Sequence, residues 1–354
     1  MLDICARPRN TLIGFCGPRG EAPVRADGTL QTLRLAELYA PIADDLAHSR
    51  RILVDELVSD QALISDLCGH VGQFHGKLLR PALLLLAGRA CGEIVAAHHV
   101  LAAVVELVHL ATLVHDDVLD EADIRRRAAT VNRLWGNGRA VLMGDFLYSH
   151  AFHLCSSLES QFAARLIGQT AITVCEGEMM QVANRGNYEL SEAEYFDIVS
   201  RKTAALVETC CHLGAWQAGA DGPTIARLRT FGQALGIAFQ IVDDLLDLTG
   251  DESEVGKSLG RDVHEGEPTL PLIHYLHTAS AERRARVLTV LSGDEPQRYR
   301  QVAASLRGSD SIAYAQSVAG EQIATARLAL AELPSSAARD SLSAMAAFVA
   351  ARRC

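Results

Sequence analysis

This 354-residue chain has few aromatic residues and no surplus of basic residues. Phe, Trp and Tyr make up only 5% of the residues. Lys and Arg number 33 against 43 Asp and Glu, which gives a formal net charge of −10 at pH 7. A chain with this balance carries no basic footprint for a nucleic acid or for an anionic membrane surface. An anionic substrate must therefore be bound by a local group of basic side chains or by a metal ion.

The chain also lacks the patterns of a secreted or membrane-spanning protein. Its nine cysteines are odd in number and scattered, without a CxxC pair or a metal-ligand spacing. The first twenty residues place arginines and a proline before a very short apolar stretch, unlike a signal peptide. Glu106 and His109 interrupt the most apolar stretch, so no run approaches the roughly 18 uncharged residues of a membrane span. We therefore expect a cytoplasmic protein in a reducing compartment, with no transmembrane segment.

Apolar residues are abundant, at 49% of the chain, and they follow a helical rather than a strand-like pattern. They recur at intervals of three and four over eight ranges: 30–58, 78–91, 95–120, 138–157, 159–184, 192–219, 223–250 and 311–333. Ser191 and Glu194 form a capping-box pattern at the start of one range. We predict an all-α fold with one domain over residues 29–354. Residues 1–28, rich in Gly, Pro and Arg without periodicity, are predicted to be a disordered extension.

Two aspartate clusters of the same form lie on apolar, helical stretches. The segments are LVHDDVLDEAD and FQIVDDLLDLTGD, and the aspartates are Asp116, Asp117, Asp120, Asp243, Asp244 and Asp247. At helical spacing the first and last carboxylates of a cluster lie about 5–6 Å apart on one face. Two unit charges at that distance repel by roughly 3 kcal/mol at an effective dielectric near 20. Since a fold would not gain stability from this twice, we interpret both clusters as oxygen ligands for Mg²⁺ that in turn holds phosphate.

Basic and polar residues suited to phosphate accompany the clusters. In HGKLLRP, Lys77 and Arg80 stand three apart at a helix start, where both can converge on one anion. His109 lies two turns before Asp116 on the same face. The other candidates follow the clusters or precede them by one turn: Arg125, Arg126, Lys202, Thr203, Gln240 and Lys257. Each has an ordinary alternative. A lone Lys–Arg pair is more typical of a surface, and His109 is typical of a hydrogen-bonded core histidine.

Taken together, these segments resemble the trans-polyprenyl diphosphate synthases, and among them the bacterial octaprenyl-type enzymes. The matching segments run in family order over about residues 33–275: GKLLRP, ELVHLATLVHDDVLDEADIRR, GNGRAVLMGDFLYS, EGEMMQ, RKTAALVE, GIAFQIVDDLLDLTGD and GKSLGRDVHEGEPTLPLI. The resemblance implies the isoprenoid synthase fold, in which antiparallel helices surround a deep central cavity. It also implies a homodimer that uses two or three Mg²⁺ ions per active site.

The resemblance assigns roles to the candidate residues. Asp116, Asp120 and Asp243 would be the principal metal ligands and, with Lys202, the catalytic residues; Asp117, Asp244 and Asp247 would bind metal directly or through water. Isopentenyl diphosphate would be bound by Lys77, Arg80, His109 and Arg126. The allylic diphosphate, farnesyl or similar, would be bound by Arg125, Lys202, Thr203, Gln240 and Lys257. The expected reaction builds a long all-trans polyprenyl diphosphate for quinone side chains.

Product length should depend on the residues below Asp116, where the growing chain descends. These are Thr112, Ala111 and Val108. Family members with short products tend to place Phe or Tyr four or five positions before the first aspartate, so Ala111 predicts an open pocket and a product well beyond C20. The alternative is that Ala111 is small only for helix packing. A shorter, geranylgeranyl-type product also remains open.

The chain departs from the family pattern at three positions. Arg127 replaces the glycine of RRG, Glu267 replaces the lysine of GKPTLP, and His75 replaces a glycine before Lys77. Glu267 removes a positive charge near the diphosphates and could weaken their binding. Two other functions fit the sequence less well. A class I terpene cyclase would lack a second DDxxD and the Lys77/Arg80 site, and a non-catalytic subunit of a heteromeric synthase would tend to lose the aspartates.

Overall fold

The computed structural model describes residues 21–26, 29–74, 76–126, 128–250, 259–293, 295 and 297–351. Over this part of the chain the all-α expectation is confirmed, because the strands are limited to two short antiparallel hairpins. Strand β1 (Glu21–Ala26) pairs with β2 (Thr29–Arg34), with Glu21 opposite Arg34. Strand β3 (Ile124–Arg125) pairs with β4 (Ala128–Ala129) just after the first aspartate cluster. The first hairpin begins inside the segment predicted as an extension; residues 1–20 lie outside the described residues.

Each of the eight predicted ranges contains helix, but the helices at 62–71, 131–135, 337–350 and between 261 and 307 lie outside them. The helices of the first half are α1 (Leu35–Leu38), η1 (Ala40–Ile42), α2 (Ala43–Glu56), α3 (Ala62–Val71), η2 (Gly72–Phe74), α4 (Leu79–Cys91), α5 (Ala96–Leu119), α6 (Val131–Trp135), α7 (Asn137–Ser156) and α8 (Gln161–Ala183). Those of the second half are α9 (Glu192–Val199), η3 (Ser200–Ala204), α10 (Ala205–Gln217), α11 (Gly222–Thr249), α13 (Arg261–Glu265), α14 (Leu270–Thr278), α15 (Ala281–Leu291), α16 (Arg298–Arg307), α17 (Ser311–Ala329) and α18 (Ala337–Ala350).

Two predicted ranges needed correction. The range 30–58 begins too early, because residues 29–34 form β2 and the long helix α2 starts only at Ala43. The range 192–219 is not one α-helix, because a π-helical turn, η3, separates α9 from α10. The capping box is confirmed: the Ser191 side chain accepts from the Glu194 backbone N–H, and the Glu194 carboxylate accepts from the Ser191 N–H.

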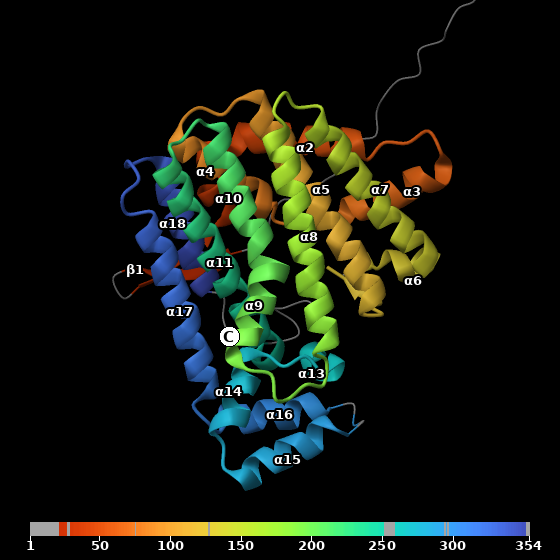
Figure 1. The fold of residues 1–354 in the computed structure, drawn as a ribbon, viewed down its shortest axis with the longest axis vertical. Coiled ribbons are helices and arrows are strands. Elements are labelled where there is room, and N and C mark those ends of the chain that lie inside the picture. Colours follow the sequence, from red (N-terminus) through yellow and green to blue (C-terminus); the bar gives the residue numbers. More distant parts are fainter. Residues whose placement is uncertain are drawn as a thin grey trace, which may run out of the picture.

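The long helices run roughly along the long axis of the molecule, and the small helices α13 to α16 form one end of it (Figure 1). Helix α10 lies inside this bundle and packs against α4, α5, α8 and α11. Its contact with α4 is close, because a Cβ added at Gly214 would lie 2.0 Å from the Leu84 carbonyl oxygen. Helices α5 and α11, which carry the aspartate clusters, are thereby held around one interior.

Helix α5 is the most apolar of the long helices. By length and composition alone it could cross a membrane, so Glu106 and His109 do not keep it below that level of apolarity as the sequence suggested. Within the fold, however, 67% of its most apolar window is buried. Its apolar surface is thus covered by neighbouring helices, as is usual for a core helix.

Candidate functional site

A cavity of about 940 Å³ opens between the helices and brings the two aspartate clusters to one site. Its wall includes most of the candidates from the sequence: Lys77, Arg80, His109, Thr112, Asp116, Asp120, Arg125, Arg126, Lys202, Thr203, Gln240, Asp243, Asp244 and Asp247. These residues are separated by up to 170 positions in the chain. Their convergence on one cavity supports their interpretation as a single site.

The first cluster lies where α5 ends. Asp116 is in the last turn of the helix, and Asp120 follows the last helical residue, Leu119. Both line the cavity, whereas Asp117 is buried and accepts a hydrogen bond from Arg125 Nε at 2.7 Å. Arg125 therefore uses its Nε donor for Asp117, and it also lines the cavity.

The second cluster lies in the last two turns of α11, and its members are held by neighbours. Asp244 accepts from the Tyr195 hydroxyl and from Gln240 Nε2, both at 2.7 Å. Gln240 is held in turn by the Thr203 hydroxyl, which donates to its amide oxygen at 2.8 Å. Asp247 accepts from the backbone N–H groups of Arg261 and Asp262 at 3.2 and 3.1 Å. The carboxylates of Asp244 and Asp247 are thus oriented before any ligand binds.

The π-helical turn η3 places Lys202 and Thr203 in the cavity wall. Such turns are rare and are frequent at functional sites. Two glycines let η3 pack closely between its neighbours: a Cβ at Gly177 of α8 would lie 2.5 Å from the Lys202 backbone nitrogen, and one at Gly236 of α11 would lie 2.5 Å from the Ala204 Cα. Glycine is therefore required at both positions, for close approach rather than for backbone conformation.

Lys202 forms an ion pair with Glu178 at 2.8 Å. Burial alone would lower the pKa of Lys202, but the Glu178 and Asp116 carboxylates outweigh burial and raise it. The ammonium group is therefore charged at neutral pH. It stands beside the first cluster, where it can bind an anion that the cluster holds through a cation.

The basic group at the other side of the cavity surrounds a buried acid. Glu106 is 2% exposed, and burial raises its pKa against the opposing effect of Arg80 and Arg126. The Arg80 Nε is buried and has no hydrogen-bond partner among the described residues. Burial and then Arg80 and Arg126 lower the pKa of His109 well below its ordinary value, so this imidazole is neutral. The group can accept an anion without a protonated histidine.

The turn that carries these basic residues has an unusual backbone. Leu78, between Lys77 and the first turn of α4, has φ 49°, and Arg126 has φ 52°. Positive φ is uncommon outside glycine and marks positions that the surrounding structure has to enforce. The Arg126 guanidinium lies against Gly76, where a Cβ would be 2.7 Å away. These constraints bring Arg126 and the Lys77 turn together, although they are about 50 residues apart.

The carboxylates of the site fit a divalent cation. Burial, and then the neighbouring Glu178, raises the pKa of Asp116 to about 7. Burial raises the pKa of Asp244 to about 7 even though Tyr195 and Gln240 donate to it. One oxygen of Asp117 and one of Glu178 are buried without a hydrogen-bond partner. These carboxylates are buried and difficult to ionise, and some of their oxygens have no hydrogen-bond partner among the described residues. Carboxylate oxygens of this kind are the hard ligands that Mg²⁺ or Ca²⁺ binds.

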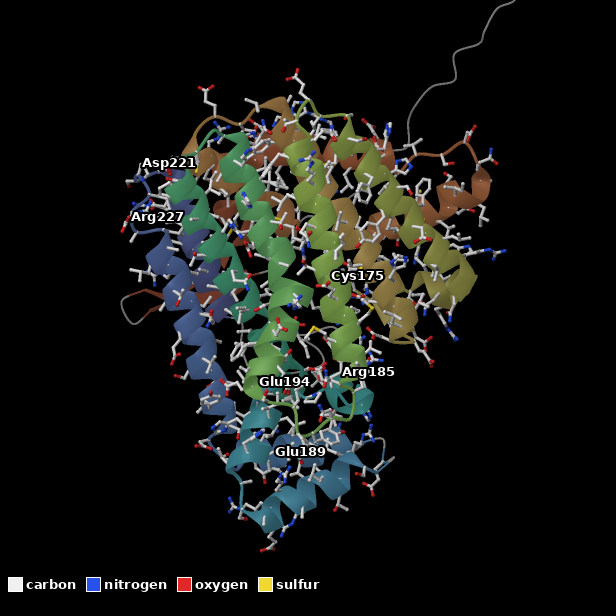
Figure 2. All side chains as sticks on the ribbon, in the orientation of Figure 1. Cys175, Arg185, Glu189, Glu194, Asp221 and Arg227 are labelled. Carbon is white, nitrogen blue, oxygen red and sulfur yellow. The ribbon has the colours of Figure 1, made fainter. Side chains whose placement is uncertain are left out.

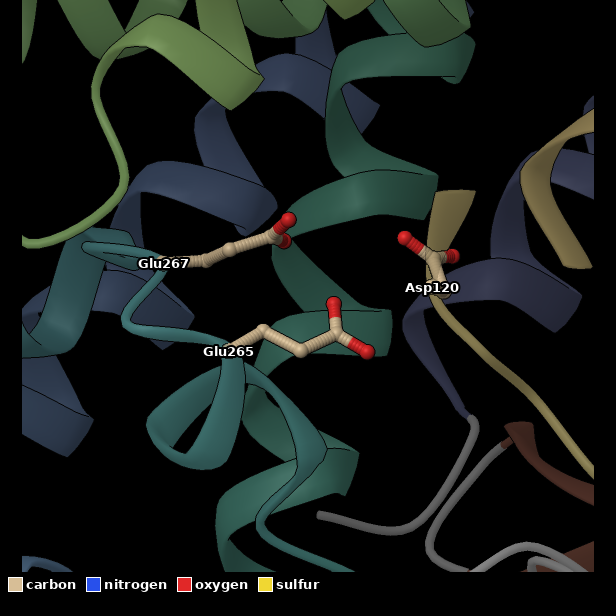
Figure 3. A group of neighbouring side chains, drawn as sticks. All are labelled: Asp120, Glu265 and Glu267. Atoms are coloured by element: carbon tan, nitrogen blue, oxygen red, sulfur yellow. The ribbon is translucent and has the colours of Figure 1, made fainter. Parts of the chain in front are cut away.

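Asp120 belongs to a charge cluster that the sequence did not reveal. Its carboxylate points toward those of Glu265 and Glu267 (Figure 3), and oxygens of the three lie within 4.8 Å of one another. Arg185 and Arg261 each form an ion pair with Asp120. Nothing in the sequence marks Arg185 or Arg261 as functional, because their partners lie 65 and 141 positions away.

The residues predicted to set product length are only partly in the cavity wall. Thr112 lines the cavity, but Ala111 and Val108, at 0% and 2% exposed, lie in the core and outside the wall. The cavity wall also includes apolar or aromatic side chains of α5, α7 and α8, namely Leu113, Val118, Tyr148, Val174 and Met179. Tyr148 belongs to the segment GNGRAVLMGDFLYS, but it was not predicted to affect product length; it is supplied by α7, 32 positions after Asp116.

Three other candidates cannot be placed. Lys257, predicted to bind the allylic diphosphate, lies outside the described residues, as do His75 and Arg127.

Comparison with known proteins identifies the family of this chain. The sequence profile of the polyprenyl synthetase family matches residues 61–307. Octaprenyl diphosphate synthase of Escherichia coli (strain K12) is 34% identical over 315 residues, covering 89% of this chain and 98% of the relative. All-trans-nonaprenyl-diphosphate synthase (geranyl-diphosphate specific) of Rhodobacter capsulatus is 36% identical over 308 residues, covering 86% and 94%.

The fold is similar to that of a solved relative as well. The crystal structure of a polyprenyl synthase from Caulobacter crescentus CB15, complexed with calcium and isoprenyl diphosphate, superposes with a TM-score of 0.85. The two sequences are 33% identical, and the match covers 91% of this chain and 98% of the other.

Proposed function

This chain belongs to the polyprenyl synthetase family, and we propose that it is a Mg²⁺-dependent trans-polyprenyl diphosphate synthase of the long-chain, octaprenyl type. It would condense isopentenyl diphosphate with an allylic diphosphate such as farnesyl diphosphate, and its product would serve as a quinone side chain. The observation that carries the proposal is one cavity whose wall combines two carboxylate clusters, a group of basic side chains and apolar residues of α5, α7 and α8. These are the parts needed to hold two diphosphates and one growing hydrocarbon chain.

The carboxylates would hold two or three Mg²⁺ ions. Asp116, Asp120 and Asp243 are the proposed direct ligands, with Asp117, Asp244 and Asp247 binding directly or through water. When bound, the ions would neutralise the charge that develops on the leaving diphosphate. Beside them, Lys202 and Arg125 line the same wall and can donate to diphosphate oxygens.

The proposed reaction breaks the allylic C–O bond heterolytically, so that both electrons leave with the diphosphate. Thr203 and Gln240 then place oxygen atoms near the allylic cation, and the rest of the pocket excludes water from it. The double bond of isopentenyl diphosphate supplies the electron pair for the new C–C bond. The carbon skeleton then loses one proton, for which the departing diphosphate is the acceptor.

Isopentenyl diphosphate would be held by the basic group around Glu106. Lys77, Arg80 and Arg126 carry the positive charge, and neutral His109 can donate one hydrogen bond without adding to it. The two diphosphate sites are then chemically distinct: one uses metal and carboxylates, and the other uses basic side chains alone.

We expect a long product because apolar side chains of α5, α7 and α8 line the cavity together with Thr112. The growing chain would descend between these helices toward Tyr148. Thr112→Phe should therefore shorten the product. Ala111→Phe should also shorten it if the prediction from the sequence holds, but Ala111 is 0% exposed and a larger side chain there costs about 1–3 kcal/mol by overpacking. Ala111→Ser is a matched control that leaves side-chain volume nearly unchanged.

The decisive experiment incubates the purified chain with Mg²⁺, isopentenyl diphosphate and farnesyl diphosphate and sizes the dephosphorylated products. Products well beyond C20 support the proposal, and a product that stops at C20 supports the shorter-chain alternative. Absence of elongation by the chain alone, with activity restored by a partner protein, would instead identify a subunit of a heteromeric synthase. No elongation under either condition refutes the proposal.

We also propose that the enzyme is a cytoplasmic homodimer. Helices α7 and α8 pack against each other and expose large apolar side chains, among them Leu142 at 67% and Ile172 at 55% exposure. Replacing both with Asp should yield a monomer in size-exclusion chromatography with light scattering. Val58→Asp, at a residue 70% exposed on the turn after α2, is the matched control and should leave the mass unchanged.

A further inference from the structure

Glu267 stands where the family pattern has a lysine, and its neighbours show how the missing charge is replaced. Arg185 donates to Glu267 Oε1 from Nε at 3.3 Å and from Nη2 at 3.2 Å. The same Nη2 donates to Asp120 Oδ1 at 2.8 Å. Arg185 follows the end of α8, at the end of the molecule that holds α13 (Figure 2). An arginine thus occupies the space next to the position from which the lysine would act.

A second arginine completes the arrangement. Arg261 pairs with the other oxygen of Asp120 through Nη2, and its Nε donates to Glu265 Oε1 at 2.5 Å. Arg261 is therefore shared between Asp120 and Glu265, and Arg185 between Asp120, Glu267 and, at 3.5 Å, Glu265. Asp120, Glu265, Glu267 and Arg261 line the cavity, and the Arg185 guanidinium is one hydrogen bond from its wall.

Asp120 and the two glutamates would respond differently to a bound cation. Asp120 is a proposed metal ligand, so a bound cation would compete with both arginines for its oxygens. Glu265 and Glu267 would still anchor Arg261 and Arg185 at the mouth of the cavity. The donors released from Asp120 would then face the allylic diphosphate, whose oxygens suit the planar fork of a guanidinium.

We propose that Arg185, assisted by Arg261, is a binding residue for the allylic diphosphate and supplies the positive charge that Glu267 removes, with Glu267 as its positioning residue. This inference rests on the proposed function. It replaces the expectation that Glu267 simply weakens substrate binding. In this chain the carboxylate holds a longer, always-charged side chain at the place where the family uses a lysine.

The test is a cycle of variants: Arg185→Ala, Glu267→Lys and the double variant. Arg185→Ala should raise the KM for farnesyl diphosphate at least tenfold and change kcat less, because a charge-assisted donor to the ground-state diphosphate is lost. Glu267→Lys alone should change KM less than threefold. In the double variant the new lysine should restore KM to within threefold of the native value. Arg185→Lys should lie between the native chain and Arg185→Ala.

Rescue is the informative outcome, since a merely structural role of Arg185 would not be restored by a lysine 82 positions away. Arg229→Ala removes another arginine held by a glutamate, Glu208 at 2.7 Å, and should leave KM unchanged. Thermal unfolding of each variant identifies any that fails to fold, in which case Arg185→Gln replaces Arg185→Ala. An unchanged KM in Arg185→Ala, or no rescue in the double variant, overturns the inference.

A second measurement separates this inference from the proposed function. Calorimetric titration with inorganic pyrophosphate and Mg²⁺ requires no turnover. Arg185→Ala should weaken pyrophosphate binding about tenfold, and Glu267→Lys should recover it in the same background. If the native chain does not elongate a prenyl chain, the proposed function fails, while the titration still decides the role of Arg185. If the native chain elongates and the affinities do not differ, only the inference fails.

Discussion

Replacing Asp116 with Asn should stabilise the metal-free protein while it abolishes activity. Burial and Glu178 raise the pKa of Asp116 to about 7, against an ordinary value of 3.8. At about 1.36 kcal/mol per pH unit, the ionised carboxylate costs the fold about 4 kcal/mol at pH 8. Asn removes that charge but keeps a polar amide, so the expected gain is about 2–4 kcal/mol. For 354 residues this corresponds to a Tm increase of roughly 3–5 °C.

The pH dependence of this gain has a definite sign. Because the folded-state pKa of Asp116 is raised, protonation stabilises the native chain fully below pH 3.8, and this stabilisation is lost as pH rises through about 7. The advantage of Asp116→Asn should therefore be largest at pH 8, about two-fifths as large at pH 5, and absent near pH 3. Saturating Mg²⁺ should reverse it at pH 8, since only the native chain retains the ligand.

The assay is thermal unfolding of both chains at pH 5 and pH 8, in EDTA and in Mg²⁺. Asp66→Asn is the matched control, because Asp66 is exposed on α3, and its Tm should not change. A lower Tm for Asp116→Asn than for the native chain in EDTA at pH 8 would refute the argument that burial of this charge destabilises the metal-free fold.

Three further outcomes are expected. Mg²⁺ binding should release protons and weaken as pH falls below 7, because burial raises the pKa of Asp116 and of Asp244 to about 7. Calorimetry in buffers of different ionisation enthalpy measures the protons released. Binding without proton release would contradict this prediction. Gly177→Ala should lower kcat at least tenfold, because the added Cβ would displace the Lys202 backbone. Gly168→Ala on the same helix should leave kcat unchanged, because a Cβ there meets no atom within 4 Å. Equal activity of the two variants would count against the role of η3. Thr112→Phe should shorten the product, and an unchanged chain length would show that the growing chain does not pass Thr112.

The sequence was sufficient where short-range physics decides the outcome. Helical periodicity identified most of the long helices to within a few residues, apart from the early start assigned before α2 and from α18, which no predicted range included. The Ser191–Glu194 capping box marked the start of α9. Like charges on apolar helical stretches were enough to infer a cation site, because that arrangement is unfavourable without a counter-charge. Both features depend on residues within about two turns of one another.

The π-helical turn could not be predicted from the same information. It depends on how closely α8 and α11 approach Ser200–Ala204, and that approach is set by Gly177 and Gly236, which are far away in the chain. Neither glycine interrupts a helix or has a positive φ, so neither looks unusual in the sequence. Only the packing shows that a side chain at these positions would displace Lys202 and Ala204.

Product length shows a different limit. Neighbouring residues on an α-helix point about 100° apart, so an error of one position moves a side chain from a cavity wall into the core. Counting turns from Asp116 led to a stretch of α5 beside the cavity, but it did not distinguish Thr112, in the wall, from Ala111, in the core. The opposite wall comes from α7 and α8, and no counting along α5 could have identified Tyr148.

Glu267 shows why a departure from a family pattern must be judged together with its neighbours in space. Considered alone, a carboxylate in place of a lysine makes the mouth of the cavity more negative by two charges. Arg185 and Arg261 lie against that same group of carboxylates and restore two positive charges, so the local balance is maintained. A lysine at position 267 would act by itself. Arg185, in contrast, depends on Glu267 to hold it once a cation occupies Asp120. Loss of Glu267 should therefore matter more in the presence of Mg²⁺ than in its absence.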